Sequence, residues 1–326
     1  MTNNIRLIGD IGGTNARFAL NTDDRIHDEM ELTCADFPTL ADAVELYLSR
    51  VTSAVTRPSE AAIDVAAALT GDHVSMTNCP WQFSINALRK ELQLKRLIVL
   101  NDFTALAMAI RHLPDHEVMR VGGLQPEKNK PIAVLGAGTG LGVSGLIPVK
   151  DAWIPLEGEG GHTSWSPSTE REAAVLNHLW QRYDHVSTER VLSGMGLVNI
   201  YLSLCALDGK PAHNYEPADI SSRGMSATDA TCAEALQMFC GILGTAASNL
   251  VLTLGAKGGV YIGGGIVPRL GDYFLRSPFR QRFESKGRYE SYLAPIPAFV
   301  ITAKLPAFTG LVQSFTSPGP RIEATA

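Results

Sequence analysis

Short apolar runs separated by glycine-rich segments open the chain and recur near its middle. Residues 9–15 lie between apolar runs at 7–8 and 16–20, and residues 136–142 lie between similar runs. An apolar run, a tight glycine turn and a second apolar run are typical of two strands joined by a hairpin. The pattern therefore predicts two hairpins, 127 residues apart.

Glycine is what the two turns share. It permits positive φ and leaves room for a ligand, so that successive backbone N–H groups can point at one anion. One such turn alone is more simply explained as a hairpin between core strands. Two matched copies favour two related halves of the chain that hold one polyphosphate between them. A third glycine cluster, at 263–265, would lie under the base of the nucleotide.

Two better-known glycine motifs fit less well. Segment 136–142 superficially resembles a dinucleotide-binding fingerprint, but that motif opens a helix, whereas strand-like residues follow here. Neither glycine segment carries the lysine of a P-loop. We therefore expect a phosphate cradle of a different type.

The longest apolar stretch, residues 227–255, predicts a buried helix that ends at Gly255 as its C-cap. Asp229 and Asn249 interrupt the stretch, whereas a membrane span needs roughly 20 almost uninterrupted apolar residues. We expect a core helix, and a strand at 259–262 that leads into the third glycine cluster.

An apolar strand at 96–100 delivers Asn101 and Asp102 to its carboxyl end. Ligands collect at that end of the strands in open α/β sheets. Asp102 also precedes an apolar helix pattern at 103–110, and for Asp102 taken alone a helix N-cap is the simpler role. A catalytic role for Asp102 is favoured only if other segments of the chain supply further polar groups for a substrate.

Such groups follow in two segments. Glu157, Glu159 and His162 lie in a glycine-rich segment, and Glu189 lies at a helix-like start. Carboxylates accept two O–H bonds and a neutral histidine accepts or donates, so this set suits the vicinal hydroxyls of a sugar. Glu189 also fits a capping arrangement and His162 could satisfy a turn carbonyl. Of the two glutamates before His162, we expect one to face the ligand, and Glu159 is nearer the histidine.

Length, charge and cysteine content narrow the remaining choices. With 326 residues the chain is long for one hydrophobic core, so two domains are expected. A net charge of -5 without a basic stripe disfavours nucleic-acid binding. Five scattered cysteines without a C-x-x-C pair suit free thiols in a reducing compartment. The N-terminus lacks a basic segment followed by an apolar one, so we expect no secretory signal, no membrane partner and a cytoplasmic location.

Seven segments, taken together and in order, resemble the bacterial glucokinases of the hexokinase and actin-like ATPase superfamily over about residues 1–302. The cysteine-rich zinc motif of the related repressor and sugar kinase group is missing, which favours the zinc-free branch. The segments are Gly9 to Arg17, Met76 to Asn78 with Trp81 and Phe83-Ser84, Asn101 to Ala105, Gly136 to Gly142, Gly158 to His162, Glu189 to Gly194, and Gly263 to Pro268.

The resemblance implies phosphorylation of D-glucose at O6 by ATP with Mg²⁺. Asp102 would be the general base, and Asp10 would lie near Mg²⁺, through water. The implied sugar-binding residues are Asn101, Asp102, Glu159, His162 and Glu189. The implied nucleotide-binding residues are Gly9, Asp10, Ile11, Gly12, Gly13, Thr14, Gly138, Thr139, Gly264 and Gly265.

The resemblance also implies an α/β fold of two actin-like, ribonuclease H-like lobes with a cleft between them, and a homodimer. The small lobe would comprise residues 1–112 plus 303–326, and the large lobe residues 113–302. Closure of the lobes would exclude water and so reduce wasteful hydrolysis of ATP. Residues 303–311 depart from the family's glycine-rich approach to the last helix, and Met195 stands where the family often has proline.

Two other functions fit the same residues. One is a kinase for another hexose, such as mannose or fructose. The other is a sugar-sensing regulator that kept the fold without turnover. Such a regulator would need a DNA-binding or partner-binding appendage, and no helix-turn-helix pattern precedes Ile5.

Overall fold

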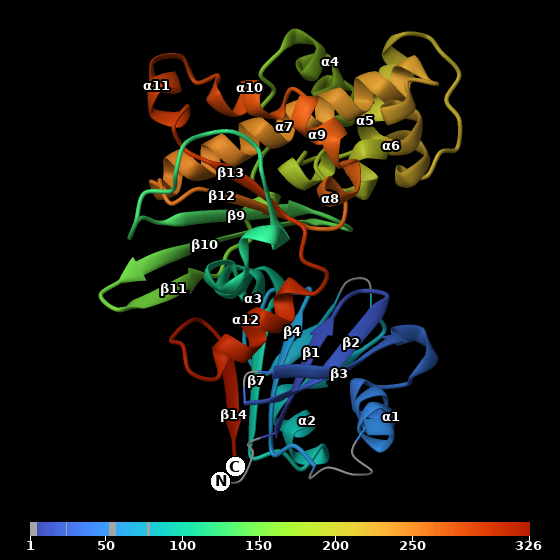
Figure 1. Ribbon diagram of the computed structural model, residues 1–326. Coiled ribbons are helices and arrows are strands. Elements are labelled where there is room, and N and C mark those ends of the chain that lie inside the picture. Colours follow the sequence, from blue (N-terminus) through green and yellow to red (C-terminus); the bar gives the residue numbers. More distant parts are fainter. Residues whose placement is uncertain (1–4, 24, 52–56, 77–78) are drawn as a thin grey trace. The chain divides into compact units, whose positions relative to one another are not determined.

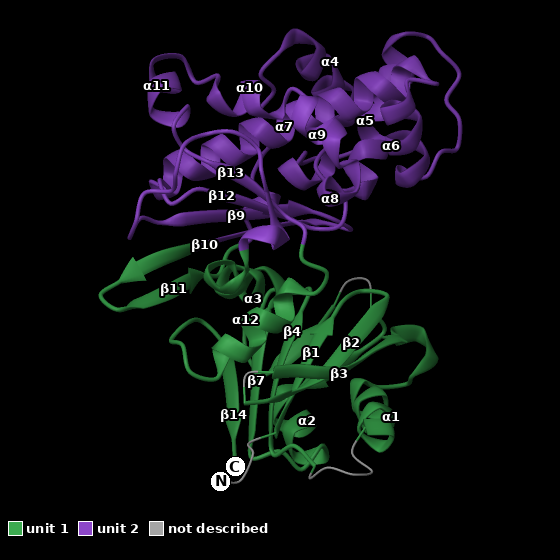
Figure 2. Cartoon of the chain, viewed as in Figure 1, with its two compact units in different colours: residues 1–114, 146–158, 303–326 green, residues 115–145, 159–302 purple. Residues whose placement is uncertain are grey.

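The computed structural model describes residues 5–23, 25–51, 57–76 and 79–326 (Figure 1). Thr77 and Asn78 of the family segments lie outside these residues. The chain divides into two compact units (Figure 2): unit 1 comprises residues 1–114, 146–158 and 303–326, and unit 2 comprises residues 115–145 and 159–302.

The division differs from the expected one at residues 113–114 and 146–158, which the family resemblance assigned to the large lobe. For residues 146–158 the reason is the long strand β10, which continues beyond residue 145, and strand β11, which contacts helix α3 of unit 1. Each unit holds strands covered by helices, so the expected α/β class is confirmed.

Unit 1 is built on a six-stranded sheet of order β14-β7-β4-β1-β2-β3. Strands β1, β4 and β7 run parallel, and β2, β3 and β14 pair antiparallel to their neighbours. The described elements of unit 1 are β1 (Ile5–Ile11), β2 (Asn15–Thr22), β3 (Arg25–Thr33), α1 (Leu40–Val51), β4 (Glu60–Val65), β5 (His73–Ser75), β6 (Gln82–Ser84), α2 (Ile85–Glu91), β7 (Arg96–Asn101), α3 (Asp102–Ala109), β11 (Ala152–Leu156), α12 (Pro306–Ser314) and β14 (Ile322–Thr325).

Helices cover both faces of this sheet, as continuous apolar strands require. Leu7 of β1 packs into a core with α1 and α2, and its neighbour Ile8 faces a second core with α3 and α12. Helices α12 and α3 approach closely at Gly310, where a Cβ would overlap the carbonyl oxygen of Ala105. The C-terminal residues are thus held by helix packing and by pairing of β14 with β7.

Unit 2 holds most of a second sheet, of order β11-β10-β9-β12-β13-β8, in which β9, β12 and β13 run parallel. Residues 146–149 of β10, together with β11, belong to unit 1. The elements of this part are β8 (Val118–Arg120), β9 (Ile132–Ala137), β10 (Leu141–Val149), α4 (Glu170–Leu179), α5 (Gly194–Leu207), α6 (Pro217–Ser226), α7 (Ala230–Leu254), β12 (Val260–Gly263), α8 (Val267–Leu270), α9 (Asp272–Arg276), α10 (Phe279–Glu284), α11 (Glu290–Leu293) and β13 (Ala298–Ile301), with short 3₁₀ segments η4 (Gly160–His162) and η5 (Thr188–Arg190).

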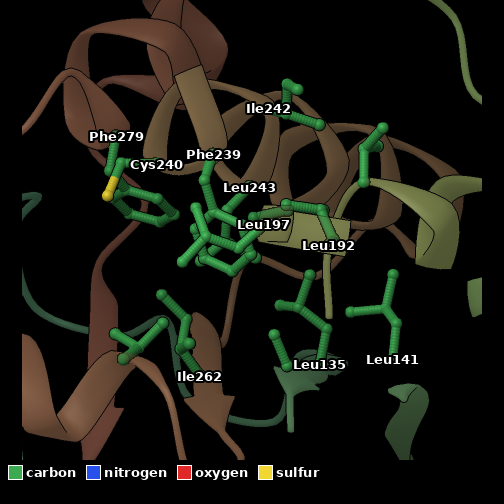
Figure 3. Close-up of a cluster of buried hydrophobic side chains, with 14 of the residues drawn as sticks. Leu135, Leu141, Leu192, Leu197, Phe239, Cys240, Ile242, Leu243, Ile262 and Phe279 are labelled. Carbon is green, nitrogen blue, oxygen red and sulfur yellow. The ribbon is translucent and has the colours of Figure 1, made fainter. Parts of the chain in front are cut away.

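The expected long helix is confirmed as α7, with Asp229 as N-cap and Gly255 as C-cap at φ 61°. By length and composition α7 could cross a membrane, but 61% of its most apolar window is buried inside the structure. Its side chains Phe239 and Leu243 lie in the core of unit 2 beside Leu135 and Ile262 of the strands (Figure 3). α7 is therefore the central helix of this core.

Both predicted hairpins are present, with tighter turns than expected. Gly9, Asp10 and Ile11 lie in β1, so the first turn is residues 12–14, and the second turn is residues 138–140. Gly9 makes room for the ring of Phe18, whose Cδ1 would be 3.1 Å from a Cβ at this position. The expected positive φ is wrong for the described glycines of these turns, since the positive φ values lie elsewhere.

Candidate functional site

In unit 1 the candidate residues gather at the carboxyl ends of three parallel strands. Asp10 of β1 is in register with Asp64 of β4, and Asp64 is in register with Leu100 of β7, two residues before Asp102. The guanidinium of Arg17 forms an ion pair with Asp10, with 3.2 Å between Nη1 and Oδ2. The sheet thus brings Asp10, Asp64 and Asp102 to one edge.

Asp64 is fully buried, and burial, followed by the charges of Asp10 and Asp102, raises its pKa well above the usual 3.8. Arg17 acts in the opposite direction. As a carboxylate, Asp64 has no hydrogen-bond partner among the described residues, whereas as a neutral acid it can donate to Asp10. Its surroundings therefore favour the protonated form of Asp64.

The helix cap after β7 is Asn101 rather than Asp102. The side-chain oxygen of Asn101 accepts hydrogen bonds from the N–H groups of Phe103 at 2.9 Å and Thr104 at 3.2 Å. Asp102 is the first residue of α3, and its Oδ1 also accepts from Phe103 N–H at 2.9 Å. The capping role that was the simpler alternative for Asp102 falls to Asn101, because the extended backbone of Asn101 places that side chain over the free N–H groups.

The first glycine turn is fixed by its own backbone. The N–H of Gly12 donates to the carbonyl of Asn15 at 3.0 Å. The buried Cys34 thiol donates to the carbonyl of Gly12 at 3.6 Å, and Cys34 N–H donates to Thr14 at 2.8 Å. Burial raises the pKa of Cys34 to about 12, so the thiol stays neutral. Within this turn, Gly12 and Gly13 are half-buried and Thr14 is exposed.

In unit 2 the side chain of Glu189 contacts the second glycine turn. The Glu189 Oε2 accepts a hydrogen bond from the N–H of Leu141, the residue after the turn, at 2.8 Å. A Cβ at Gly140 would stand 2.5 Å from the same oxygen, so glycine is required there for the carboxylate to reach the backbone. The capping role considered for Glu189 is wrong, because its carboxylate binds a strand 48 residues away.

The histidine segment packs on the same strand. A Cβ at Gly161 would overlap the carbonyl oxygen of Leu141, and a Cβ at Gly160 would stand 2.8 Å from Cγ1 of Val143. This packing leaves Glu159 and His162 exposed, with 3.9 Å between Glu159 Oε2 and His162 Nε2. Glu159, His162 and Glu189 therefore surround the start of β10.

The third glycine cluster also packs against the second hairpin. Gly264, at φ 78°, lies so close to Ala137 that a Cβ would overlap its carbonyl. Ile266 N–H donates to Ala137 O at 3.2 Å, whereas a Cβ at Gly265 would meet open space. Close backbone packing explains Gly264, and Gly265 is free to accommodate a ligand.

An apolar cavity of about 330 Å³ lies in unit 2, lined by residues that include Leu135, Val143, Trp165 and Leu250. Its lining contains neither Glu159, His162 nor Glu189. The cavity therefore differs in chemistry from the polar candidate site.

Asp64 and Arg17 are the site residues to which the sequence analysis gave no role. The signal for Asp64 was a single acid within the apolar run 61–65, and the signal for Arg17 was a base within the apolar run 16–20 that follows the first turn. Both signals are weak without the sheet register that aligns them with Asp10.

Among the described residues, no group of three or more His, Cys, Asp or Glu side chains could hold a metal by itself. Mg²⁺ usually keeps several waters and binds through one or two carboxylates plus substrate phosphates. A partly exposed Asp10 beside a glycine turn fits this mode of binding.

Comparisons with known proteins agree with one another. A sequence model of the family described as Glucokinase matches residues 7–317. The chain is 53% identical over 307 residues to a protein named Glucokinase from Chromobacterium violaceum, covering 94% of this chain and 88% of that one. It is 51% identical over 308 residues, 94% of this chain, to a Bifunctional protein glk from Burkholderia pseudomallei, and spans 48% of that relative. The crystal structure of a glucokinase from an Antarctic psychrotroph is 34% identical, with a TM-score of 0.84 and coverage of 95% of this chain and 98% of that chain.

Proposed function

We propose, because the chain belongs to the glucokinase family, that it transfers the terminal phosphoryl group of ATP to the 6-hydroxyl of D-glucose. The observation that carries the proposal is the contact between Glu189 and the glycine turn at 138–140. A carboxylate suited to a sugar hydroxyl and a backbone turn suited to a phosphate lie side by side in one substructure.

The sugar would be held by hydrogen bonds to its ring hydroxyls. In unit 2 the exposed Glu159 and His162 and the half-buried Glu189 offer acceptors, and His162 can also donate. In unit 1 the Asn101 amide is oriented because its oxygen caps α3 and its nitrogen donates to the Ala67 carbonyl at 3.3 Å. Rigid positioning of this kind lowers the entropy cost of aligning O6 with the phosphorus.

Asp102 is the proposed general base. It lies at the first position of α3 with one oxygen on Phe103 N–H, which fixes the carboxylate. As O6 of glucose bonds to the γ-phosphorus and the bond to the ADP oxygen breaks, Asp102 takes the proton from O6. Because the transition state of phosphoryl transfer is loose, orientation of the hydroxyl contributes more than its deprotonation.

The nucleotide would be held by the first hairpin, the second glycine turn and the third glycine cluster, through their backbone N–H groups. The proposed contacts are Gly9 to Thr14 in unit 1, and Gly138, Thr139, Gly264 and Gly265 in unit 2, although Gly9 and the Ile11 side chain are buried in the strand. Mg²⁺, when bound near Asp10, would supply charge neutralisation at the phosphates. Arg17 orients Asp10 through their ion pair.

The proposal is tested by sugar-dependent release of ADP in a coupled assay with Mg-ATP. We expect rapid release with D-glucose and slow release without sugar. ADP release at the same rate with and without sugar would refute the assignment as a sugar kinase. A panel with mannose and fructose, compared by kcat/KM, separates a glucokinase from a kinase for another hexose. The homodimer and the cytoplasmic location stay predictions.

A further inference from the structure

Glu189 makes a contact that binding of a sugar does not require. Its Oε2 is held at 2.8 Å by the N–H of Leu141, at the end of the proposed phosphate turn. Its Oε1 has no hydrogen-bond donor within residues 5–23, 25–51, 57–76 and 79–326. The Glu189 carboxylate thus has one oxygen that is hydrogen-bonded to the turn and a second oxygen that can accept a hydrogen bond from a ligand.

The segment that carries Glu189 holds the turn at both ends. Gly194 N–H donates to the Gly138 carbonyl at 2.8 Å, while Glu189 binds the N–H of Leu141. The Ser193 hydroxyl donates to the Glu189 carbonyl at 2.9 Å and so fixes the segment internally. The side chains of Leu141 and Leu192 both lie in the buried cluster of unit 2 (Figure 3), so strand and segment share one core.

The same segment is joined to the residues after His162. Thr188 N–H donates to the Thr163 carbonyl at 2.8 Å, and Ser164 and Ser187 form a β-bridge. The segments that carry the proposed sugar ligands of unit 2 and the phosphate turn are therefore parts of one hydrogen-bonded assembly, with Glu189 as the side chain that joins them.

We propose that Glu189 is a positioning residue for the nucleotide as well as a sugar ligand, and that it makes sugar and nucleotide bind cooperatively. This inference rests on the proposed function, in which the turn receives phosphate. A sugar hydroxyl on Oε1 would restrict the carboxylate, and the turn bound to Oε2 would then be more ordered before the nucleotide arrives. By linkage, each ligand must tighten the binding of the other by the same factor, about 5- to 150-fold for a typical coupling.

The decisive measurement is calorimetric titration of a non-hydrolysable ATP analogue with Mg²⁺ in the absence of sugar. We expect Glu189→Ala to weaken nucleotide binding about tenfold, because a charge-assisted hydrogen bond to the turn is lost. Glu189→Gln should restore most of the affinity, since its amide oxygen can still accept from Leu141. Equal nucleotide affinity in wild type and Glu189→Ala would overturn the inference.

Two further variants separate the positioning role from general damage. Glu170→Gln alters an exposed acid of unit 2 outside the proposed site, so nucleotide affinity without sugar should match that of wild type. Gly140→Ala would place a Cβ 2.5 Å from Oε2 and displace the carboxylate while keeping it. It should weaken nucleotide binding in the wild-type background and have little further effect in the Glu189→Ala background.

The cooperativity is measured by repeating each titration at saturating glucose. Wild type should gain affinity for the nucleotide, and Glu189→Ala should lose most of this gain; an undiminished gain would refute the coupling. Thermal unfolding reports whether each variant is folded. If Glu189→Ala does not fold, the same titrations of Gly140→Ala provide the test. A wild-type protein that bound no nucleotide would instead contradict the proposed function.

Discussion

Asp64 shows how strongly one residue can depend on its surroundings in this protein. It lies inside β4 between apolar neighbours, is fully buried, and faces Asp10 and Asp102 with Arg17 as the opposing positive charge. Burial of a carboxylate without a hydrogen-bond donor costs several times more than burial of the neutral acid. The carboxyl group therefore holds its proton to a higher pH in the folded protein than in the unfolded chain.

This difference predicts a pH-dependent stability. The pKa of Asp64 is raised in the folded state, so its contribution is fully present below about pH 4 and falls as pH rises, by about 1.4 kcal/mol per pH unit, until the folded-state pKa is passed. Asp64→Asn removes this titration. The free energy of unfolding of Asp64→Asn relative to wild type should therefore rise between pH 5 and pH 8 in urea titrations. If the free energies of unfolding of wild type and Asp64→Asn changed in parallel with pH, a raised pKa of Asp64 would be contradicted.

Asp102 is tested by a change in chemistry at nearly constant shape. Asp102→Asn should lower kcat about 10² to 10⁴-fold, the usual contribution of a general base. Sugar affinity should change by less than about tenfold, because the other hydrogen bonds to the ring remain. Steady-state kinetics and a glucose titration measure the two effects. Asp115→Asn, at an exposed acid of unit 2, is the control, and an undiminished kcat in Asp102→Asn would exclude Asp102 as the base.

At the scale of elements, the strands and helices with a clear local pattern were predictable. The hairpins followed from apolar runs around glycine, and α7 followed from a long apolar stretch that ends at Gly255. The cap of α3 is Asn101, one position before the residue for which capping was considered, because Asn101 and Asp102 are both good capping residues. The choice between them depends on where β7 ends, which the sequence does not specify to one residue.

Contacts between distant segments could not be predicted in the same way. The carboxylate of Glu189 reaches Leu141 across 48 residues, and its partner is a backbone N–H with no sequence signature. The burial of Asp64 likewise depends on the adjacent strands β1 and β7, not on its own neighbours in the sequence. The candidate residues were predictable by type and segment, but their partners required the fold.

The contact between α12 and α3 gives a prediction for element packing. Gly310→Ala would push a Cβ into the carbonyl of Ala105, and the two helices must separate. Overpacking against backbone costs about 1–3 kcal/mol or more, so the free energy of unfolding should fall by at least that amount. Gln313→Ala on the same helix is the control and should change stability by less than about 0.5 kcal/mol. Equal stabilities would show that α12 does not need this close approach.

At the scale of the whole molecule, two units divide the proposed chemistry. Unit 1 carries the carboxylates Asp10, Asp64 and Asp102 at the carboxyl ends of its strands, and unit 2 carries Glu189 and the glycine turn beside β10. Each unit supplies a glycine hairpin between strands. Repetition of the hairpin was the first indication of a nucleotide site, and family membership now agrees with that interpretation.

The central claim is that this chain makes glucose 6-phosphate. The most direct measurement is ³¹P and ¹H NMR of the product formed from D-glucose and Mg-ATP by the purified protein. We predict one ADP for each sugar phosphate, with the phosphate on O6, and a rate at least about 10²-fold lower for Asp102→Asn. ADP formation without a phosphorylated sugar, or a phosphate on another hydroxyl, would contradict the account.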